Sequence, residues 1–203
     1  NRFYVIEAKE NYVSLESITT LTTITTTTSS TTSSTTSSTT TTSTTLPITY
    51  TNTTVFYDGF ESWSSSNCGH NSLWTKCTYG DGEIERDDDQ YNGTYALKFE
   101  DHDSDTNYLV KCMNLSSYNK VHLRFYWKKE SLDSGEYGKI DINMTNLTYT
   151  QVFDSGTGTS SYASNTIDIT SYSSTNSCVK IHALADSGSD EFYIDDFTVI
   201  GQS

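Results

Sequence analysis

Carboxylates are the most frequent side chains with chemical potential in this 203-residue chain, which has 26 Asp and Glu against 12 Lys and Arg. Asp101, Asp103 and Asp105 alternate as in a calcium loop, and oxygen ligands suit this hard cation. The glycine and the distal glutamate of an EF-hand loop do not follow them. Acidic residues that only keep a surface soluble are the simpler interpretation of this run.

Motifs for catalysis are lacking. The histidines, His70, His102, His122 and His182, stand in different segments, and none accompanies a G-x-S-x-G nucleophile motif. A carboxylate pair for glycoside hydrolysis can be drawn by chance from so many acidic residues. The sequence therefore predicts a protein that is not an enzyme.

The overall charge limits the partners of the chain. Its formal net charge is −14, whereas nucleic acids are bound through cationic side chains. Nucleic acid and anionic membrane surfaces are therefore excluded as expected partners. No apolar run approaches the roughly 18 residues that a membrane-spanning helix requires.

Aromatic side chains could form a platform on which sugars stack, since the chain has 15 Tyr and 3 Trp. Trp127 alternates with apolar residues, so we expect it to be buried. Trp74 lies between Cys68 and Cys77, and it is the tryptophan that we expect to be available to a ligand. Most aromatic residues of a β-sandwich belong to its core, which leaves carbohydrate binding as a secondary interpretation.

Four cysteines, an even number, are typical of an oxidising compartment. Of the three possible pairings we favour Cys68–Cys77, which closes a short loop, and Cys112–Cys178, which joins two distant strands. Four buried free thiols are the alternative, whereas zinc is disfavoured because no C-x2-C spacing occurs.

Glycosylation sequons also indicate a secreted protein. The five N-x-[ST] sequons, which predict N-linked glycans, stand at Asn52, Asn92, Asn114, Asn143 and Asn146. The chain begins at Asn1 rather than Met, from which we expect that a leader has been removed. The predicted location is extracellular, at the cell surface.

Residues 1–45 form a tail with an unusual composition. All residues of Thr19–Thr45 are Ser or Thr except Leu21 and Ile24. Such a run has too little apolar surface to offset the entropy of ordering, and its dense hydroxyl groups suit an O-glycosylated stalk. Apolar residues ahead of and within it are Phe3, Val5, Ile18, Leu21 and Ile24. They predict a strand that folds into another subunit, although a disordered leader remnant is the simpler alternative.

Residues 46–203 have the pattern of an all-β domain. In the segment from Val121 to Lys128, Val121, Leu123, Phe125 and Trp127 alternate with polar residues. The expected strands are Thr53–Tyr57, Tyr95–Glu100, Tyr108–Met113, Val121–Lys128, Lys139–Asn143, Thr148–Phe153, Asn165–Ile169, Cys178–Ala185 and Glu191–Ile200. Regularly spaced short strands without a convincing helix predict an antiparallel β-sandwich.

Four segments carry a resemblance that spans nearly all of this domain: GFESW, GTYALKFED, NYLVKCMNLSSYNKVHLRFYW and EFYIDDFTVIG. Their order is similar to that in jelly-roll sandwiches of the carbohydrate-binding-module and MAM-like kind. Such sandwiches often hold a structural Ca²⁺ between the first and last strands. The resemblance implies Glu61 and Asp196 as the ligands of a calcium ion here.

The layout of the whole chain resembles subunits of archaeal surface threads, in which a processed tail is donated to the neighbouring sandwich head. The first hypothesis is therefore a structural subunit of an extracellular filament, a head-to-tail homopolymer joined by strand donation. The alternative is a secreted carbohydrate-binding or adhesive sandwich on a glycosylated stalk. The two differ in residues 1–24, which are essential to assembly in the first and dispensable in the second.

Overall fold

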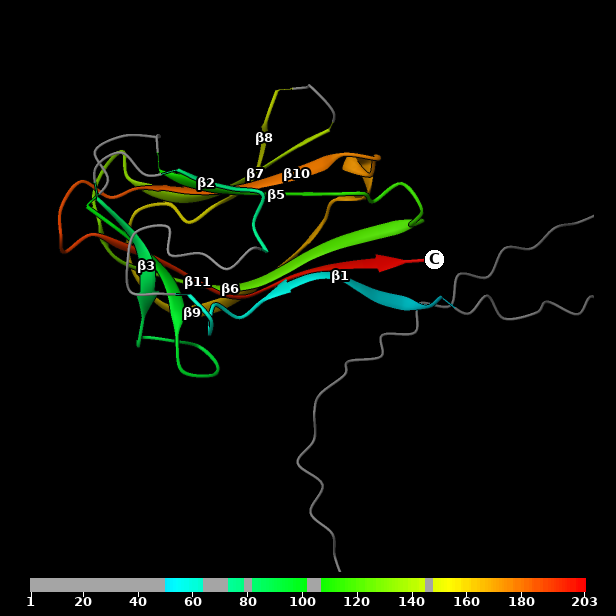
Figure 1. Ribbon diagram of the computed structural model, residues 1–203. Coiled ribbons are helices and arrows are strands. Elements are labelled where there is room, and N and C mark those ends of the chain that lie inside the picture. Colours follow the sequence, from blue (N-terminus) through cyan, green and yellow to red (C-terminus); the bar gives the residue numbers. More distant parts are fainter. Residues whose placement is uncertain (1–49, 64–72, 79–81, 102–106, 145–147) are drawn as a thin grey trace, which may run out of the picture. The chain divides into compact units, whose positions relative to one another are not determined.

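The computed structural model describes residues 50–63, 73–78, 82–101, 107–144 and 148–203 (Figure 1). The predicted donor strand and the Ser/Thr-rich stretch of residues 1–45 lie outside the described residues, as do Cys68, Asp103, Asp105 and Asn146. The strand donation, disulfide, calcium and glycosylation predicted for these residues are therefore not tested by the structure.

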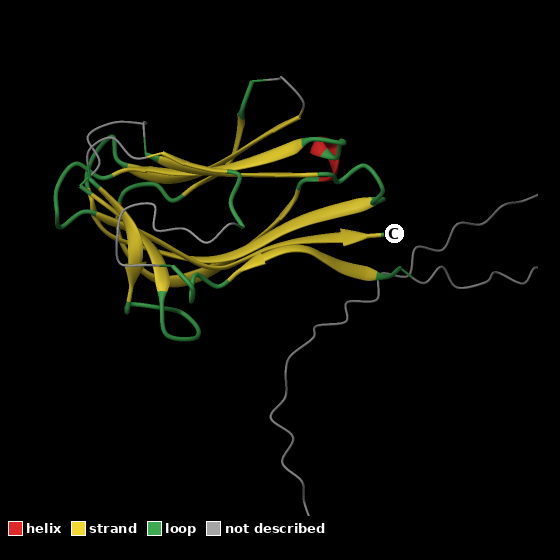
Figure 2. Cartoon of the chain, viewed as in Figure 1, coloured by secondary structure: helices red, strands yellow, loops and turns green. Residues whose placement is uncertain are grey.

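Two antiparallel sheets pack face to face (Figures 1 and 2). The six-stranded sheet contains β1 (Asn52–Asp58), β3 (Glu83–Asp87), β4 (Ala96–Glu100), β6 (Lys120–Leu132), β9 (Gly158–Asp168) and β11 (Glu191–Gln202). Its order is β3-β4-β11-β6-β9, and β1 pairs with the C-terminal half of β11. The five-stranded sheet has the order β2-β5-β10-β7-β8. Its members are β2 (Lys76–Thr78), β5 (Tyr108–Met113), β7 (Tyr137–Met144), β8 (Thr150–Asp154) and β10 (Ser177–Leu184).

The predicted antiparallel β-sandwich is therefore confirmed. A single turn of 3-10 helix, η1 (Thr170–Tyr172), is the only helical element in the described ranges. No helix within these ranges has the length and apolar character needed to cross a bilayer.

Alternation along the strands produces the core between the sheets. Val121, Leu123 and Phe125 of β6 have no exposed surface, and neither do Val179 and Ile181 of β10. Because successive side chains of a strand point to opposite faces, every second residue enters the core.

The prediction that Trp127 is buried is wrong, because this residue is half-buried. The pairing of β6 with β9 shifts register between Trp127 and Lys129, which interrupts the alternation. The Trp127 indole N–H donates to Asn165 Oδ1 at 2.9 Å and its ring packs on Phe153.

Each of the nine expected strands has its counterpart in the structure, but two short ones, β2 and β3, were not predicted. β3 presents one buried apolar residue, Ile84, among charged ones, so it has no alternating apolar pattern of its own. β9 begins at Gly158 rather than Asn165, because pairing with β6 extends it through a Ser-rich segment that has no alternating apolar pattern.

The cysteine prediction is confirmed for one pair. Cys112 and Cys178 are directly opposite one another on β5 and β10 and form a disulfide. Cys77 is also disulfide-bonded, and its predicted partner, Cys68, lies outside the described residues.

Trp74 is a core residue, so the prediction that it is available to a ligand is wrong. It is 4% exposed, and its indole N–H donates to Asp58 Oδ2 at 2.7 Å. The Trp63 indole N–H donates to the same oxygen at 3.2 Å, and the Phe60 N–H donates to Asp58 Oδ1 at 2.8 Å. A buried carboxylate requires such donors, and here Asp58 orients both indoles toward the interior.

Candidate functional site

The outer face of the five-stranded sheet is the candidate functional site. Leu109, Ile142 and Ile181 point into the core and are fully buried. Their neighbours along the strands therefore point outward, which places Tyr108 and Lys180 on this face.

A hollow of about 480 Å³ lies on this face, which is within the size range of about 300–1,000 Å³ that is usual for ligand sites. Its walls are formed by Thr75, Tyr108, Val110, Cys112, Tyr149 and Lys180. The ammonium group of Lys180 lies 5.2 Å from the centre of the Tyr108 ring and 6.0 Å from that of Tyr149. The hollow thus combines two aromatic rings with a hydrogen-bond donor between them.

Further polar groups continue along the same sheet. His182, which pairs with Tyr108 across the strands, has its Nε2 3.1 Å from Asp141 Oδ2. The Tyr137 ring lies 5.7 Å from the imidazole, and the Lys139 ammonium group lies 3.5 Å above Tyr137. Aromatic faces pack against the C–H groups of a sugar, while exposed amine groups bind its hydroxyls. His182 is 4% exposed, so it supports the sheet beneath this face.

The residues predicted to bind calcium lie at the other sheet, and each accepts hydrogen bonds from the protein. Glu61 Oε1 accepts the N–H groups of Thr94 at 2.8 Å and Tyr95 at 3.2 Å. Asp196 accepts the Tyr57 hydroxyl at 2.6 Å and the Asn92 side-chain amide at 3.2 Å. Calcium at this pair remains a prediction.

Two acidic clusters in the described ranges bring three carboxylates within 4.8 Å of one another, and neither includes Glu61 or Asp196. They consist of Glu83, Glu85 and Glu100, and of Glu136, Asp186 and Asp190. Both are engaged with protein donors: Lys98 forms ion pairs with Glu85 and Glu100, and Glu136 Oε1 accepts the Asp186 N–H at 2.6 Å.

Asp195 is a buried carboxylate that the sequence analysis did not single out. Its Oδ2 accepts the backbone N–H groups of Tyr91 at 3.0 Å and Asn92 at 2.9 Å. Burial raises the pKa of Asp195 to about 6, against the lowering effect of these hydrogen bonds. Only the tertiary fold could reveal this role, since Tyr91 is more than a hundred residues away in sequence.

The sequons occupy different environments. Asn52, Asn92 and Asn114 are exposed, whereas Asn143 is half-buried within β7. Occupancy of these sites by glycans remains a prediction.

Comparisons with known proteins agree on the fold. No family model and no curated protein matches the chain. The C-terminal family 22 carbohydrate-binding module of Clostridium thermocellum Xyn10B matches with a TM-score of 0.53 and 14% identity, over 73% of this chain and 92% of that one. The module TmCBM61, solved with β-1,4-galactotriose, gives 0.51 and 15%, over 70% and 92%.

The K2 cleaved adhesin domain of Lys-gingipain is equally similar, with a TM-score of 0.51 and 14% identity over 71% of this chain and 96% of that domain. At such identities the likeness concerns the fold alone. The described domain therefore has the β-sandwich fold of carbohydrate-binding modules.

Proposed function

We propose that the domain of residues 50–203 binds carbohydrate on the outer face of its five-stranded sheet. The observation that carries this proposal is the hollow in which Tyr108 and Tyr149 flank the Lys180 amine. Rings that stack on a sugar and a donor that binds its hydroxyls are the two components that such a site requires. The fold shared with a family 22 carbohydrate-binding module and with TmCBM61, which was solved with β-1,4-galactotriose, supports this role, which needs no catalytic group.

Substitution of the two rings tests the proposal. Tyr108→Ala and Tyr149→Ala are each expected to weaken oligosaccharide binding at least tenfold, because about 1.4 kcal/mol of stacking energy is lost. Binding is measured by calorimetry of the full chain with xylo-oligosaccharides and β-1,4-galacto-oligosaccharides.

Tyr50→Ala is the matched control, since Tyr50 is an exposed tyrosine outside the hollow. It should leave the affinity unchanged. Absence of binding to every oligosaccharide tested, or full affinity in the Tyr108→Ala variant, contradicts the proposal.

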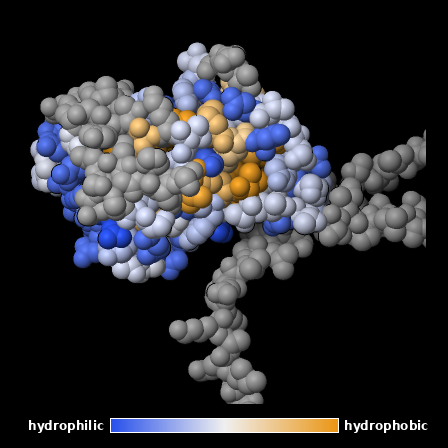
Figure 3. All heavy atoms as spheres, in the orientation of Figure 1, coloured by the Kyte–Doolittle hydropathy of each residue, from blue (hydrophilic) through white to orange (hydrophobic). Residues whose placement is uncertain are grey.

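A second proposed function is head-to-tail assembly into an extracellular filament, which one feature of the sandwich favours. Apolar residues gather between the two layers on the side where β1 and β5 lie (Figure 3). Among the described residues, β1 pairs only with β11, and β2 covers β5 only from Tyr108 to Val110. Strand edges that remain unpaired beside an apolar surface can accept an added strand.

The occupant proposed for this surface is the segment Phe3–Ile24 of a neighbouring copy, with Phe3, Val5, Ile18, Leu21 and Ile24 entering the apolar layer. Deletion of residues 1–24 is expected to give a folded monomer, as measured by size-exclusion chromatography with light scattering. A synthetic peptide of residues 1–24 should raise the melting temperature of this variant. Filaments formed by the truncated protein would exclude donation by this segment.

A further inference from the structure

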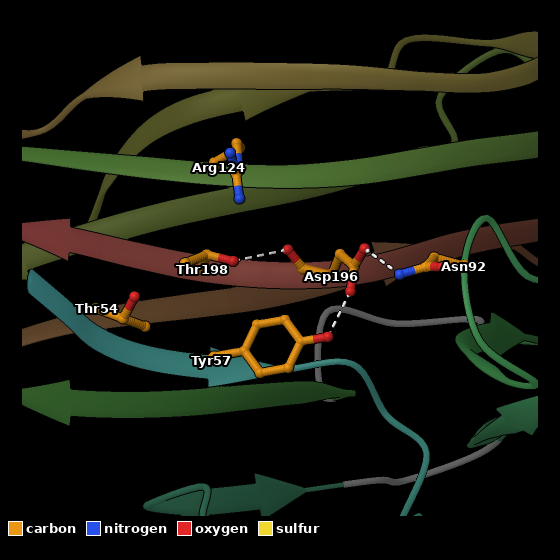
Figure 4. Close-up of a pocket in the computed structure, with 6 residues that line it drawn as sticks. All are labelled: Thr54, Tyr57, Asn92, Arg124, Asp196 and Thr198. Carbon is orange, nitrogen blue, oxygen red and sulfur yellow. Dashed lines mark hydrogen bonds between the residues drawn. The ribbon is translucent and has the colours of Figure 1, made fainter. Parts of the chain in front are cut away.

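A second hollow, of about 410 Å³, lies on the outer face of the six-stranded sheet (Figure 4). One row of its wall crosses three strands. Thr198 of β11 pairs with Tyr57 of β1 on one side and with Arg124 of β6 on the other. Thr54, Asn92 and Asp196 complete its walls. This hollow shares no lining residue with the face proposed above to bind carbohydrate.

Asn92 in this wall begins the sequon Asn92-Gly93-Thr94, which makes it an acceptor for an N-linked glycan. Asn92 and Thr94 are exposed, so a transferase can reach them. Figure 4 shows that Asn92 points from its loop toward Asp196 on β11, and its Nδ2 donates to Asp196 Oδ2 at 3.2 Å.

The sequon loop is held at both ends by carboxylates. Asp195 accepts the N–H of Asn92, and Glu61 accepts that of Thr94. Gly93 has φ +79°, a backbone conformation that favours glycine, and a Cβ at this position would collide with the Glu61 carboxylate. The orientation of Asn92 over the hollow is therefore built into the fold.

Asp196 adopts a positive φ of 47°, which is uncommon outside glycine. It lies where the pairing of β11 with β6 shifts register between Asp195 and Thr198. A bulge of this kind re-aims a side chain, and here the carboxylate receives the Tyr57 hydroxyl at 2.6 Å (Figure 4). Strained backbone that the surroundings enforce is typical of functional sites.

The remaining groups of the hollow suit a sugar ring. Tyr57 is 51% exposed, which leaves its ring face open for stacking. Arg124 is exposed and forms no ion pair within the described residues, so its guanidinium can donate to ligand oxygens. The Thr54 hydroxyl adds a donor and an acceptor, and the Thr198 hydroxyl, which donates to the Asp196 backbone oxygen at 3.1 Å, adds an acceptor.

We propose that Asn92 carries an N-linked glycan whose first pyranose lies in this hollow, against Tyr57 and Arg124. The transfer joins Asn92 Nδ2 to C1 of a sugar carried on a lipid diphosphate; the lipid diphosphate leaves, and Nδ2 gives up one proton. The second N–H of Nδ2 remains and keeps its hydrogen bond to Asp196. The inference is independent of sugar binding at the other sheet.

Two other sequons lie wholly within the described ranges, at Asn52 and Asn114, and neither borders a hollow of this kind. The Asn114 Oδ1 accepts both the N–H and the hydroxyl of Ser116 in a local turn. Asn52 Oδ1 accepts the amide of Gln202, and neither asparagine lines either hollow. Asn114 lines neither hollow, so a glycan on it provides the matched reference.

The test uses the full chain secreted from a eukaryotic host that performs N-glycosylation, with peptide mass spectrometry at Asn92 and Asn114. Thr94→Ala removes the glycan from Asn92, whereas Ser116→Ala removes that from Asn114. Each is combined with Tyr57→Ala, and the melting temperatures of the glycosylated forms and the variants are compared. Loss of the Asn92 glycan is expected to lower the melting temperature by at least about 2 °C, an effect of about 1 kcal/mol.

In the Tyr57→Ala background the expected loss is less than half as large, because the stacking partner is gone. Loss of the Asn114 glycan should have the same effect in both backgrounds. An unmodified Asn92 beside a modified Asn114, or an Asn92 effect that is independent of Tyr57, overturns the proposal.

Discussion

Replacement of Lys98 by methionine is expected to lower the free energy of unfolding by about 3–5 kcal/mol at pH 7. Lys98 is 8% exposed on β4, and its ammonium group forms ion pairs with carboxylates of three strands. The partners are Glu85 at 3.6 Å, Asp87 at 3.5 Å, Glu191 at 3.9 Å, and Glu100. Burial alone lowers the pKa of Lys98, but these carboxylates outweigh it and raise the pKa above its ordinary value.

Methionine retains the volume of the side chain but leaves four carboxylates without their cation. Chemical denaturation at pH 7 measures the loss. The matched control is Lys139→Met, since Lys139 lies 3.7 Å from one carboxylate, Asp154, and both are partly exposed. A single pair of this kind is worth less than about 1 kcal/mol. Equal losses in the two variants would contradict the role assigned to Lys98.

The deficit of the Lys98→Met variant should also depend on pH. Burial already raises the pKa of Glu85 and Glu191, while Lys98 lowers both. Removal of the amine therefore raises these pKa values further, so the folded variant takes up protons more readily than its unfolded chain. Stability then increases as pH falls through the raised pKa values and is lost as pH rises through them. Denaturation at pH 4.5 should consequently show a smaller deficit than at pH 7.

Loss of the Cys112–Cys178 disulfide is expected to lower the free energy of unfolding by about 4 kcal/mol. The bond spans 66 residues, and closure of so long a loop restricts the unfolded chain. Urea denaturation of the double variant Cys112→Ala/Cys178→Ala measures this effect. Because β5 and β10 pair along their whole facing length, the variant should still fold to the same sandwich.

Mapping under non-reducing conditions provides the covalent check, since the peptides that contain Cys112 and Cys178 should be recovered linked. The second predicted pair, Cys68–Cys77, closes a much shorter loop, and its removal should cost about 2.5 kcal/mol in the same model. A double variant of Cys112 and Cys178 with unchanged stability would show that the loop constraint contributes nothing.

The sequence by itself determined the fold class and nine of the eleven described strands, because alternation is a local property. Val121, Leu123 and Phe125 enter the core as their spacing predicts. The burial of a polar side chain, in contrast, depends on the neighbouring strands. Lys98 occupies a polar position in the alternation, yet it is buried because β3 and β11 bring carboxylates to it from both sides.

Sites were harder to predict than strands, since their members come from distant segments. The resemblance implied Glu61 and Asp196 as calcium ligands, which remains a prediction. Only the fold shows that Glu61 accepts the Thr94 N–H and that Asp196 accepts the Asn92 side-chain amide. Trp74 was expected to be free, and it is held in the core by the buried Asp58 carboxylate.

The candidate carbohydrate face illustrates the same division. The alternating pattern of β5 and β10 indicates that Tyr108 and Lys180 lie on a face opposite to Leu109 and Ile181. It does not indicate that Tyr149 lies beside them, because that position depends on the order β5-β10-β7-β8 in the sheet. Strand order and register are decided by long-range pairing, so the tertiary structure alone places the two rings around one amine.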